Sequence, residues 1–191
     1  MSWKMRWVMG LLLVIAGGVF AQRNSARQGD QVVGQRSVGE ELDGWVTKTE
    51  ALLVPAADAM PEEKYSFAPS NGEFNGVRTF AEQVKHLAAA NYILASAALG
   101  EKPPHGEANE IAPDSLRSKA EILAYLKGSF ALLHRAAAAI NSANEKEVLG
   151  PKRKLTRTGL LIDALLHSQN HYGQMVEYLR MNGIVPPESR R

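Results

Sequence analysis

Two histidines four residues apart, His167 and His171, have the most distinctive spacing of any side chains in this sequence. On an α-helix, residues i and i+4 lie one turn apart on the same face, so their imidazole rings can bind one metal ion together. The other residues of that face are mostly suited to burial: Leu160, Ala164, Gln174 and Tyr178. Because a buried imidazole needs a partner, the pair indicates a metal site, with two hydrogen-bonded structural histidines as the alternative.

A third histidine, His86, strengthens the metal hypothesis because it shares the face of a predicted helix with Ala90 and Ile93. It lies 13 residues before the end of that helix, which is about 20 Å. His167 and His171 lie 10 and 14 residues after the start of theirs, about 15–21 Å. If the two helices are antiparallel, the three rings are level. Three histidines with an open fourth position are typical of a reactive metal site.

The expected chemistry follows from the charge that three neutral imidazoles leave on a divalent ion. The ion would lower the pKa of bound water towards about 7 and supply either a hydroxide nucleophile for hydrolysis or a Lewis acid for a substrate oxygen. Zinc or nickel is the first expectation, and copper or iron would also suit the ligands. The sequence has no His-Glu-x-x-His motif, so a zincin protease mechanism is not supported.

Four other titratable residues could take part in the site or lie outside it. Asp163 and Glu82 each lie one turn before an inferred ligand, so either could hydrogen-bond to a ligand or act as a general base. Asp163 is the candidate acceptor for a second ring proton, whereas Glu82 already has a helix-capping role. His105 is predicted to be exposed in a proline-rich loop, and His134 to be structural or on the surface.

Four amphipathic helices must position these side chains, and the sequence predicts them over 38–59, 80–99, 119–141 and 157–182. The first three follow capping-box patterns that start at Ser37, Thr79 and Ser118. Pro55 is expected to kink or break the first helix. The fold class is therefore all-α, a four-helix bundle that buries four apolar stripes. About 18 residues connect the second and third helices, enough to span a helix, so these two helices can lie parallel.

The N-terminus has the pattern of a secretory signal peptide over residues 1–21. Lys4 and Arg6 precede an uncharged stretch of 14 residues, and Val19 and Ala21 form a small-residue cleavage site before Gln22. A membrane anchor is the alternative, but it needs roughly 20 apolar residues. We expect an exported protein, periplasmic or secreted, with no stable membrane span after cleavage. A flexible lead-in over 22–36, the bundle over 37–187 and a tail over 188–191 complete the predicted organisation.

Composition limits the classes of partner. The chain of 191 residues has no cysteine, which rules out disulfides, thiolate metal sites and a catalytic thiol. Without Lys4 and Arg6 it has 20 basic and 20 acidic residues, so it lacks the basic excess of a nucleic-acid-binding protein. The expected partners are a small-molecule substrate or ligand of unknown identity, and the bundle could also form a homodimer.

Two groups of segments resemble the DinB/YfiT-like superfamily. The first is Val77–Leu87 (VRTFAEQVKHL) with Gly100–Pro104 (GEKPP), and the second is His167–Gln174 (HSQNHYGQ) with Tyr178–Arg180 and Gly183–Pro187. The resemblance covers about residues 38–187. It implies a four-helix bundle with a non-sequential helix arrangement and a divalent metal held by three histidines, which match His86, His167 and His171 here.

The resemblance leaves three functions open. The first is an exported metal-dependent hydrolase, as many relatives are described. The second is a metal-dependent transferase of low-molecular-weight thiols, which the export signal disfavours because such thiols are mainly cytosolic. The third is a non-catalytic bundle that binds a metal or another ligand. An acid–base residue beside the metal would favour the hydrolase, a basic pocket the transferase, and a closed fourth ligand position the binding protein.

Overall fold

The computed structural model describes residues 36–149 and 154–190 of the chain. Its helices are α1 (Val38–Ala59), α2 (Phe80–Leu99), α3 (Lys119–Ala138) and α4 (Arg157–Met181). Two 3-10 turns, Glu62–Lys64 and Pro187–Ser189, and two short strands, β1 (Val148–Leu149) and β2 (Leu155–Thr156), complete the elements of these residues. The predicted signal peptide over residues 1–21 and most of the predicted lead-in over 22–36 lie outside the described residues.

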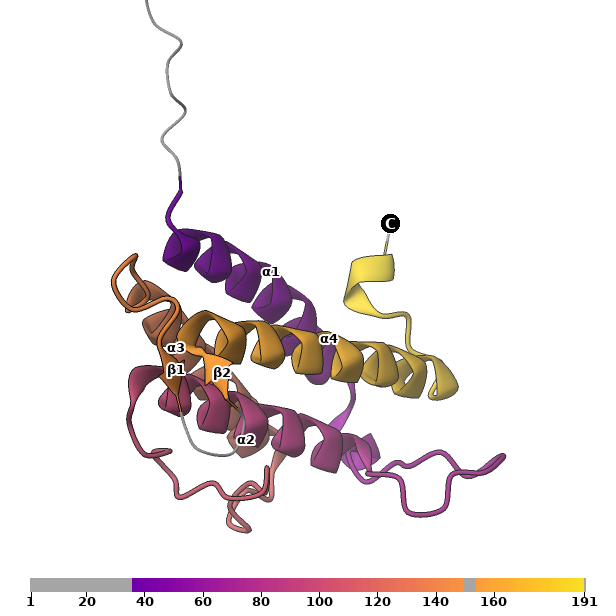
Figure 1. The fold of residues 1–191 in the computed structure, drawn as a ribbon. Coiled ribbons are helices and arrows are strands. Elements are labelled where there is room, and N and C mark those ends of the chain that lie inside the picture. The colour runs from indigo at the N-terminus through magenta and orange to yellow at the C-terminus, as the bar shows by residue number, and fades with distance from the viewer. Residues whose placement is uncertain (1–35, 150–153, 191) are drawn as a thin grey trace, which may run out of the picture. The chain divides into compact units, whose positions relative to one another are not determined.

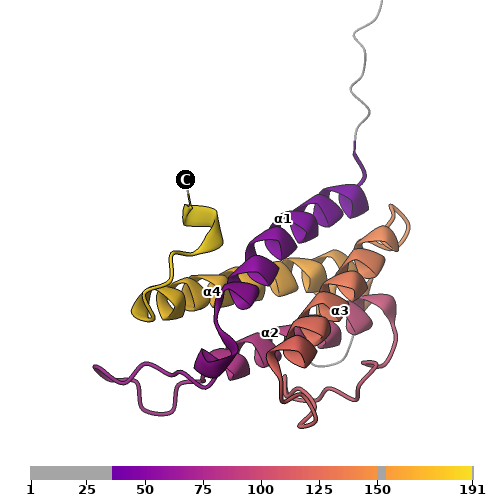
Figure 2. The same ribbon diagram turned by 180° about the vertical axis from the view of Figure 1, so that it is seen from behind.

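The four helices form the predicted bundle, in which α2 packs against α3 and α4, and α1 packs against the same two helices (Figures 1 and 2). Helices α2 and α4 are antiparallel neighbours, as expected. Gln83 near the start of α2 bonds to Gln174 late in α4, whereas Arg157 at the start of α4 donates to the carbonyl of Ala98 near the end of α2.

Helices α2 and α3 run parallel, as the length of their connection allowed. The rings of Tyr92 and Tyr125 lie 4.9 Å apart, and an ion pair joins Glu101 to Arg135 beyond them. Helix α1 is antiparallel to α3, because Asp58 near its end is paired with Lys119 at the start of α3. The bundle therefore has two helices in each direction.

Local sequence explains where these helices begin. The hydroxyl groups of Ser37, Thr79 and Ser118 accept hydrogen bonds from the backbone amides three residues on. In return, the carboxylate of the glutamate at that position accepts a hydrogen bond from the backbone amide of the capping residue. These capping boxes satisfy amides that have no partner inside the helix. All three predicted helix starts are confirmed.

Three local predictions need correction. Helix α3 ends at Ala138, not at 141, because the side chain of Asn144 donates to the carbonyl of Ala139 and supports a turn there. Pro55 does not break α1. The carbonyl of Ala51 that Pro55 leaves without its helical partner is on the exposed side, where water can replace the missing donor. The short β1–β2 ladder was not predicted.

The core lies where the four apolar stripes meet. Its largest fully buried side chains include Phe80, Phe130 and Leu53, and α2 contributes a run of buried alanines that lets its neighbours approach closely. A buried polar cluster links three helices there: Asn91 of α2 donates to Ser129 of α3 and accepts from Ser168 of α4. Within the described part of the chain, no helix is long and apolar enough to span a membrane.

A close approach between α1 and α3 depends on a glycine. A Cβ atom at Gly39 would lie 2.7 Å from the carbonyl oxygens of both Ala137 and Ile140, which belong to the backbone and cannot rotate away. Gly44, one and a half turns further along α1, has no such neighbour, because the nearest atom is a side-chain nitrogen of Arg36 at 3.9 Å.

Gly39→Ala should therefore lower the free energy of unfolding by about 1–3 kcal/mol, because the two helices must separate to admit the methyl group. Gly44→Ala is the matched control and should raise it by up to about 1 kcal/mol, because alanine is the better helix former. Urea denaturation of both variants measures the difference. Stabilisation by Gly39→Ala would contradict the close packing of α1 on α3.

Candidate metal centre

His86, His167 and His171 meet between α2 and α4, as their spacing predicted. The Nε2 atom of His167 lies 3.2 Å from Nε2 of His86 and 3.1 Å from Nε2 of His171. Helix α4 places two of the rings one turn apart, and the antiparallel α2 brings the third to the same level. These residues form the one group of three potential metal ligands found within the described ranges.

The outer ring nitrogens show which tautomers are present. Nδ1 of His86 donates to the backbone carbonyl of Glu110 at 3.2 Å, since a carbonyl can only accept. Nδ1 of His171 donates to Oε1 of Gln83 at 2.7 Å, while Nε2 of Gln83 donates to Gln174. His86 and His171 therefore both direct an Nε2 lone pair at Nε2 of His167.

Hydrogen bonds between the rings cannot satisfy this arrangement. A single proton on Nε2 of His167 can serve only one of the two facing lone pairs. Nδ1 of His167 is itself buried without a hydrogen-bond partner among the described residues. A cation at the meeting point would accept all three lone pairs, and neutral imidazole is the form that ligates metals.

The spacing of the ring nitrogens also fits a metal ion. With metal–nitrogen bonds of about 2.0–2.1 Å, ligand atoms lie about 3.4 Å apart around a tetrahedral ion and about 2.9 Å apart around an octahedral one. The observed separations of 3.1 and 3.2 Å lie between these values. Both separations from His167 therefore fit a divalent ion of open identity, and the ligand atoms of all three residues lie within 4.8 Å of one another.

The surroundings keep all three imidazoles neutral. Burial lowers the pKa of His171 to about 3, with further lowering by the charges of His167 and His86. Burial also lowers the pKa of His167 and of His86, and in His86 the nearby Arg78 adds to the effect. A neutral triad needs no deprotonation before it binds a cation near pH 7.

Glu110, in the connection between α2 and α3, lies beside the triad although sequence analysis did not select it. Its carboxylate oxygen is 3.6 Å from Nε2 of His86, and its side chain is 30% exposed. Asn109 and Glu110 both have left-handed backbone angles, with φ of 54° and 61°, in a tight turn closed between Ala108 and Ile111. Glutamate is unusual there, since the conformation costs about 1 kcal/mol or more.

A signal for Glu110 was present in the sequence. Structureless connections longer than about 12–15 residues are uncommon unless they have a function, and the connection between α2 and α3 exceeds that length. In the sequence, this length indicated only that α2 and α3 can run parallel. Gln83 was missed for a different reason, because its role in holding His171 depends on a contact between two helices.

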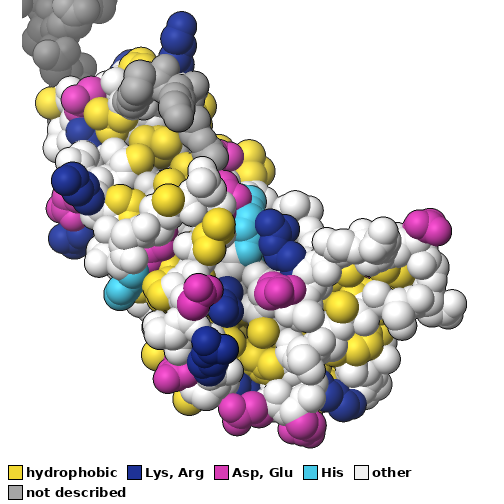
Figure 3. All heavy atoms as spheres, turned by 90° about the horizontal axis from the view of Figure 1, so that it is seen from below, with side chains coloured by type: hydrophobic (Ala, Val, Ile, Leu, Met, Phe, Trp, Pro, Cys, Tyr) yellow, Lys and Arg dark blue, Asp and Glu magenta, His cyan; other side chains and the backbone are white. Residues whose placement is uncertain are grey.

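A hollow of about 500 Å³ opens beside His86 and Glu110. Arg78 and Lys85 also line it, together with acidic side chains. Seen from below, the molecule shows histidine side chains at its surface, one of them next to a basic and close to an acidic side chain (Figure 3). Of the triad, His86 lines this hollow, whose charged side chains are of both signs.

Glu82 and Asp163, the two carboxylates suggested as hydrogen-bond partners or general bases for the triad, have different surroundings in the structure. Glu82 caps α2 through Thr79, which lowers the pKa of its carboxyl, so its structural interpretation is supported. Asp163 is not the hydrogen-bond acceptor for Nδ1 of His167, which has none among the described residues, so that prediction was wrong. Its negative charge still acts on His167 through space.

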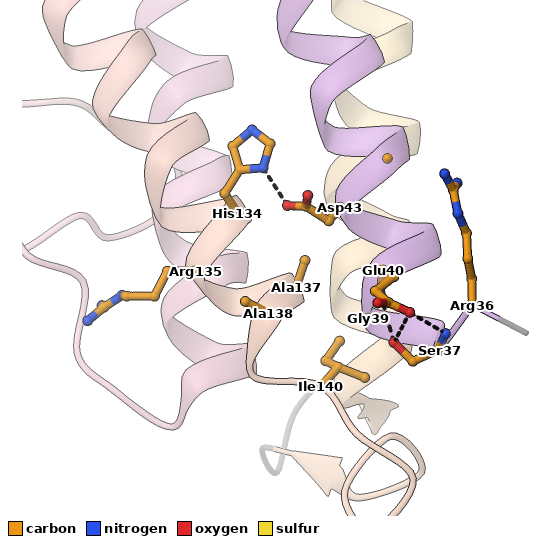
Figure 4. A pocket seen from close by; sticks show the side chains of 11 residues that line it. Arg36, Ser37, Gly39, Glu40, Asp43, His134, Arg135, Ala137, Ala138 and Ile140 are labelled. Carbon is orange, nitrogen blue, oxygen red and sulfur yellow. Dashed lines mark hydrogen bonds and ion pairs between the residues drawn. The ribbon is translucent and has the colours of Figure 1, made fainter. Parts of the chain in front are cut away.

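The two remaining histidines lie apart from the triad. His105 is exposed, and its ring packs against Tyr92 and Tyr125. His134 on α3 points across a pocket to Asp43 on α1, with Nδ1 2.5 Å from the carboxylate, and its Nε2 lies 3.2 Å from Glu50 (Figure 4). His105 is therefore exposed and His134 has structural surroundings, as predicted.

The His134 bridge should make stability depend on pH. Burial alone would lower the pKa of His134, but hydrogen bonds to Asp43 and Glu50 raise it above the ordinary value. A raised pKa in the folded state stabilises the protein fully below the unfolded pKa of about 6.5, and this stabilisation is lost as the pH rises through the folded value.

His134→Gln should therefore cost on the order of 1 kcal/mol at pH 6 and progressively less above it. Urea midpoints of the original protein and the variant between pH 5.5 and 9 measure this difference. A constant difference across that range would show that the charge on His134 does not contribute.

Comparison with known proteins agrees with this architecture. The family profile described as the DinB superfamily matches residues 46–175, which is more than half of the chain and includes all three histidines of the triad. No curated protein matches the chain. With four helices in the predicted arrangement and this match, the chain belongs to the DinB superfamily.

Proposed function

We propose that this protein is an exported metal-dependent hydrolase that holds one divalent ion through His86, His167 and His171. The observation that carries the proposal is the meeting of the three Nε2 atoms, two of which direct lone pairs at the third. Export rests on the signal-peptide pattern of residues 1–21. Zinc and nickel are the ions that we would test first.

A bound ion would supply a strongly polarised water for attack on an ester, amide or related bond. The residues of the chain have supporting roles in this proposal. The carbonyl of Glu110 and the side chain of Gln83 hold the rings of His86 and His171 with Nε2 inward. The carboxylate of Glu110, 3.6 Å from Nε2 of His86, is close enough to accept a proton beside the triad.

One observation favours the thiol transferase as a second candidate. Arg78 and Lys85 line the hollow, and the charge of Arg78 acts on all three histidines. Such cations could bind the carboxylates of a small thiol. The same hollow contains Glu82, Glu110 and Asp114, so its charge is not predominantly basic. The hydrolase remains the first proposal because Glu110 provides an acid–base group next to the triad.

Metal binding is tested by replacing each histidine of the triad with alanine. Loss of a direct ligand should weaken zinc or nickel binding by more than the 10–100-fold expected for loss of a supporting residue. An ion at 100 times its Kd adds about 2.7 kcal/mol to the free energy of unfolding, and the variants should lose this gain. Isothermal titration and thermal melts with and without metal measure both effects.

His105→Ala is the matched control for metal binding, since His105 lies outside the triad. It should keep the full affinity and the full metal-dependent rise in melting temperature. If His105→Ala lost the ion while His86→Ala retained it, the assignment of the ligands would be wrong.

The catalytic part of the proposal is tested by Glu110→Gln in the metal-loaded protein. Removing a general base should lower the rate on chromogenic esters, lactones or phosphoesters by about 10²–10⁴-fold without loss of the ion. Glu82→Gln, which removes a nearby capping carboxylate, should leave the rate unchanged. Loss of the metal from Glu110→Gln would make Glu110 a ligand, and the absence of any metal-dependent hydrolysis would favour a binding protein.

A further inference from the structure

Glu107, in the connection between α2 and α3, is the one acidic residue that is buried within the described part of the chain. Its carboxylate accepts two hydrogen bonds, from the hydroxyl of Tyr125 on α3 at 2.7 Å and from the backbone amide of His105 at 3.1 Å. Burial and the bond to Glu107 raise the pKa of Tyr125, so its hydroxyl keeps the proton that it donates. A buried carboxylate is costly without such partners, so these bonds fix the place of Glu107.

Aromatic rings cover this contact. The centroids of the Tyr92, Tyr125 and His105 rings lie 4.9 to 5.5 Å from one another. Tyr92 and Tyr125 are each only 6% exposed. The rings come from α2, α3 and the start of the connection, so they hold the hydrogen bond between Glu107 and Tyr125 away from water. A hydrogen bond in such a setting is stronger than one at the surface.

The residues after Glu107 form the left-handed turn that begins at Ala108 and ends at Ile111. The amide of Ile111 donates to the carbonyl of Ala108 at 3.1 Å, and both residues between them have positive φ. Glycine is preferred at the second of these central positions, which is occupied here by Glu110. A backbone conformation of this kind persists only where its surroundings fix it.

The turn is fixed on both sides. Glu107 attaches the chain before the turn to α3, through the bond to Tyr125. Ala112, directly after the turn, is buried and belongs to the core. The Glu107–Tyr125 contact is therefore the hydrogen-bonded anchor of the turn, and the apolar contact of Ala112 is the other anchor.

The tip of the turn touches the histidine triad. The carbonyl of Glu110 accepts the hydrogen bond from Nδ1 of His86, and the Glu110 carboxylate lies 3.6 Å from Nε2 of the same ring. If the turn moved, Nδ1 of His86 would lose its acceptor. The ring could then carry its proton on Nε2 instead, and that nitrogen would have no lone pair to offer a metal.

We propose that Glu107 and Tyr125 are positioning residues for the metal centre, because their hydrogen bond anchors the turn that holds His86 with its Nε2 lone pair towards His167. Neither residue touches the triad, so each acts through the turn and Glu110. The consequence for metal affinity rests on the proposed metal binding, whereas the consequence for the ring of His86 is present without an ion.

Tyr125→Phe tests the anchor in the intact, metal-free protein. It removes the hydroxyl and keeps the ring, so the turn should open more often, and the amide of Ile111 should exchange with solvent about tenfold faster. His86 should change from the Nδ1–H tautomer alone to a mixture of both tautomers. Hydrogen exchange measures the first effect, and long-range ¹H–¹⁵N correlation spectra of the histidine rings measure the second.

Tyr92→Phe is the matched control. It removes a hydroxyl from an equally buried ring of the same cluster, and within the described residues that hydroxyl makes no hydrogen bond to Glu107. Exchange at Ile111 and the tautomer of His86 should therefore remain as in the unaltered protein. Circular dichroism checks that both variants are folded.

Zinc affinity gives an independent measurement. Loss of a residue that directly supports a ligand weakens metal binding by about 10–100-fold. Tyr125→Phe acts one step further away and should weaken zinc binding by about tenfold in isothermal titration. Glu107→Ala should have the same effect. Glu107→Gln should retain most of the affinity, because its amide oxygen can still accept the hydroxyl of Tyr125.

The double variant Glu107→Ala/Tyr125→Phe tests whether the two residues act together. If they act through one hydrogen bond, the double variant should bind zinc as tightly as either single variant. Losses that multiply would show that the residues act separately, which would overturn the proposal.

The proposal would also be overturned if Tyr125→Phe altered the tautomer of His86 no more than Tyr92→Phe does. A different result bears on the proposed function: if the unaltered protein bound no divalent ion, metal binding would be excluded. The tautomer of His86 in Tyr125→Phe would then still decide whether Glu107 and Tyr125 position that ring.

Discussion

Two nitrogen lone pairs directed at the third ring of a histidine triad inside the bundle are the constraint on which the rest of this structure depends. One proton on Nε2 of His167 can satisfy only one of these lone pairs, and burial lowers the pKa of the rings, which disfavours a further proton. The rings of His86 and His171 are held in this orientation, because Nδ1 of each donates to a fixed acceptor, the Glu110 carbonyl or the Gln83 side chain. The fold therefore holds a cluster with an unsatisfied lone pair that a bound ion would accept.

The parts of the fold that repeat along the helices could be predicted from the sequence. Capping boxes located three helix starts, and the i, i+4 spacing with the antiparallel register located the triad. Features that arise where separate segments meet could not be predicted in this way. The left-handed turn at Glu110 has no periodicity, and the partners of Gln83 and His134 lie on other helices.

Two wrong expectations have the same origin. Pro55 was expected to kink or break α1, and it does not break the helix. The carbonyl that it leaves without a partner is on the solvent side, and the local sequence does not show which side of the helix faces solvent. Asp163 was expected to bond to His167 because residues one turn apart are neighbours on a helix. Proximity along a helix brings two side chains to the same face, but it does not direct the ring nitrogen towards the carboxylate.

The order in which the helices pack has a consequence for folding. Helices α1 and α2 follow one another in the chain but are not packed neighbours, and both rest on α3 and α4. No early helical hairpin can therefore form from the first half of the chain. Helix α4 packs on both α1 and α2, so the core is complete only when the last helix is present, and these contacts join segments that are far apart in the sequence. Until α4 has been synthesised, the faces of α1 and α2 that it covers in the bundle have no native partner.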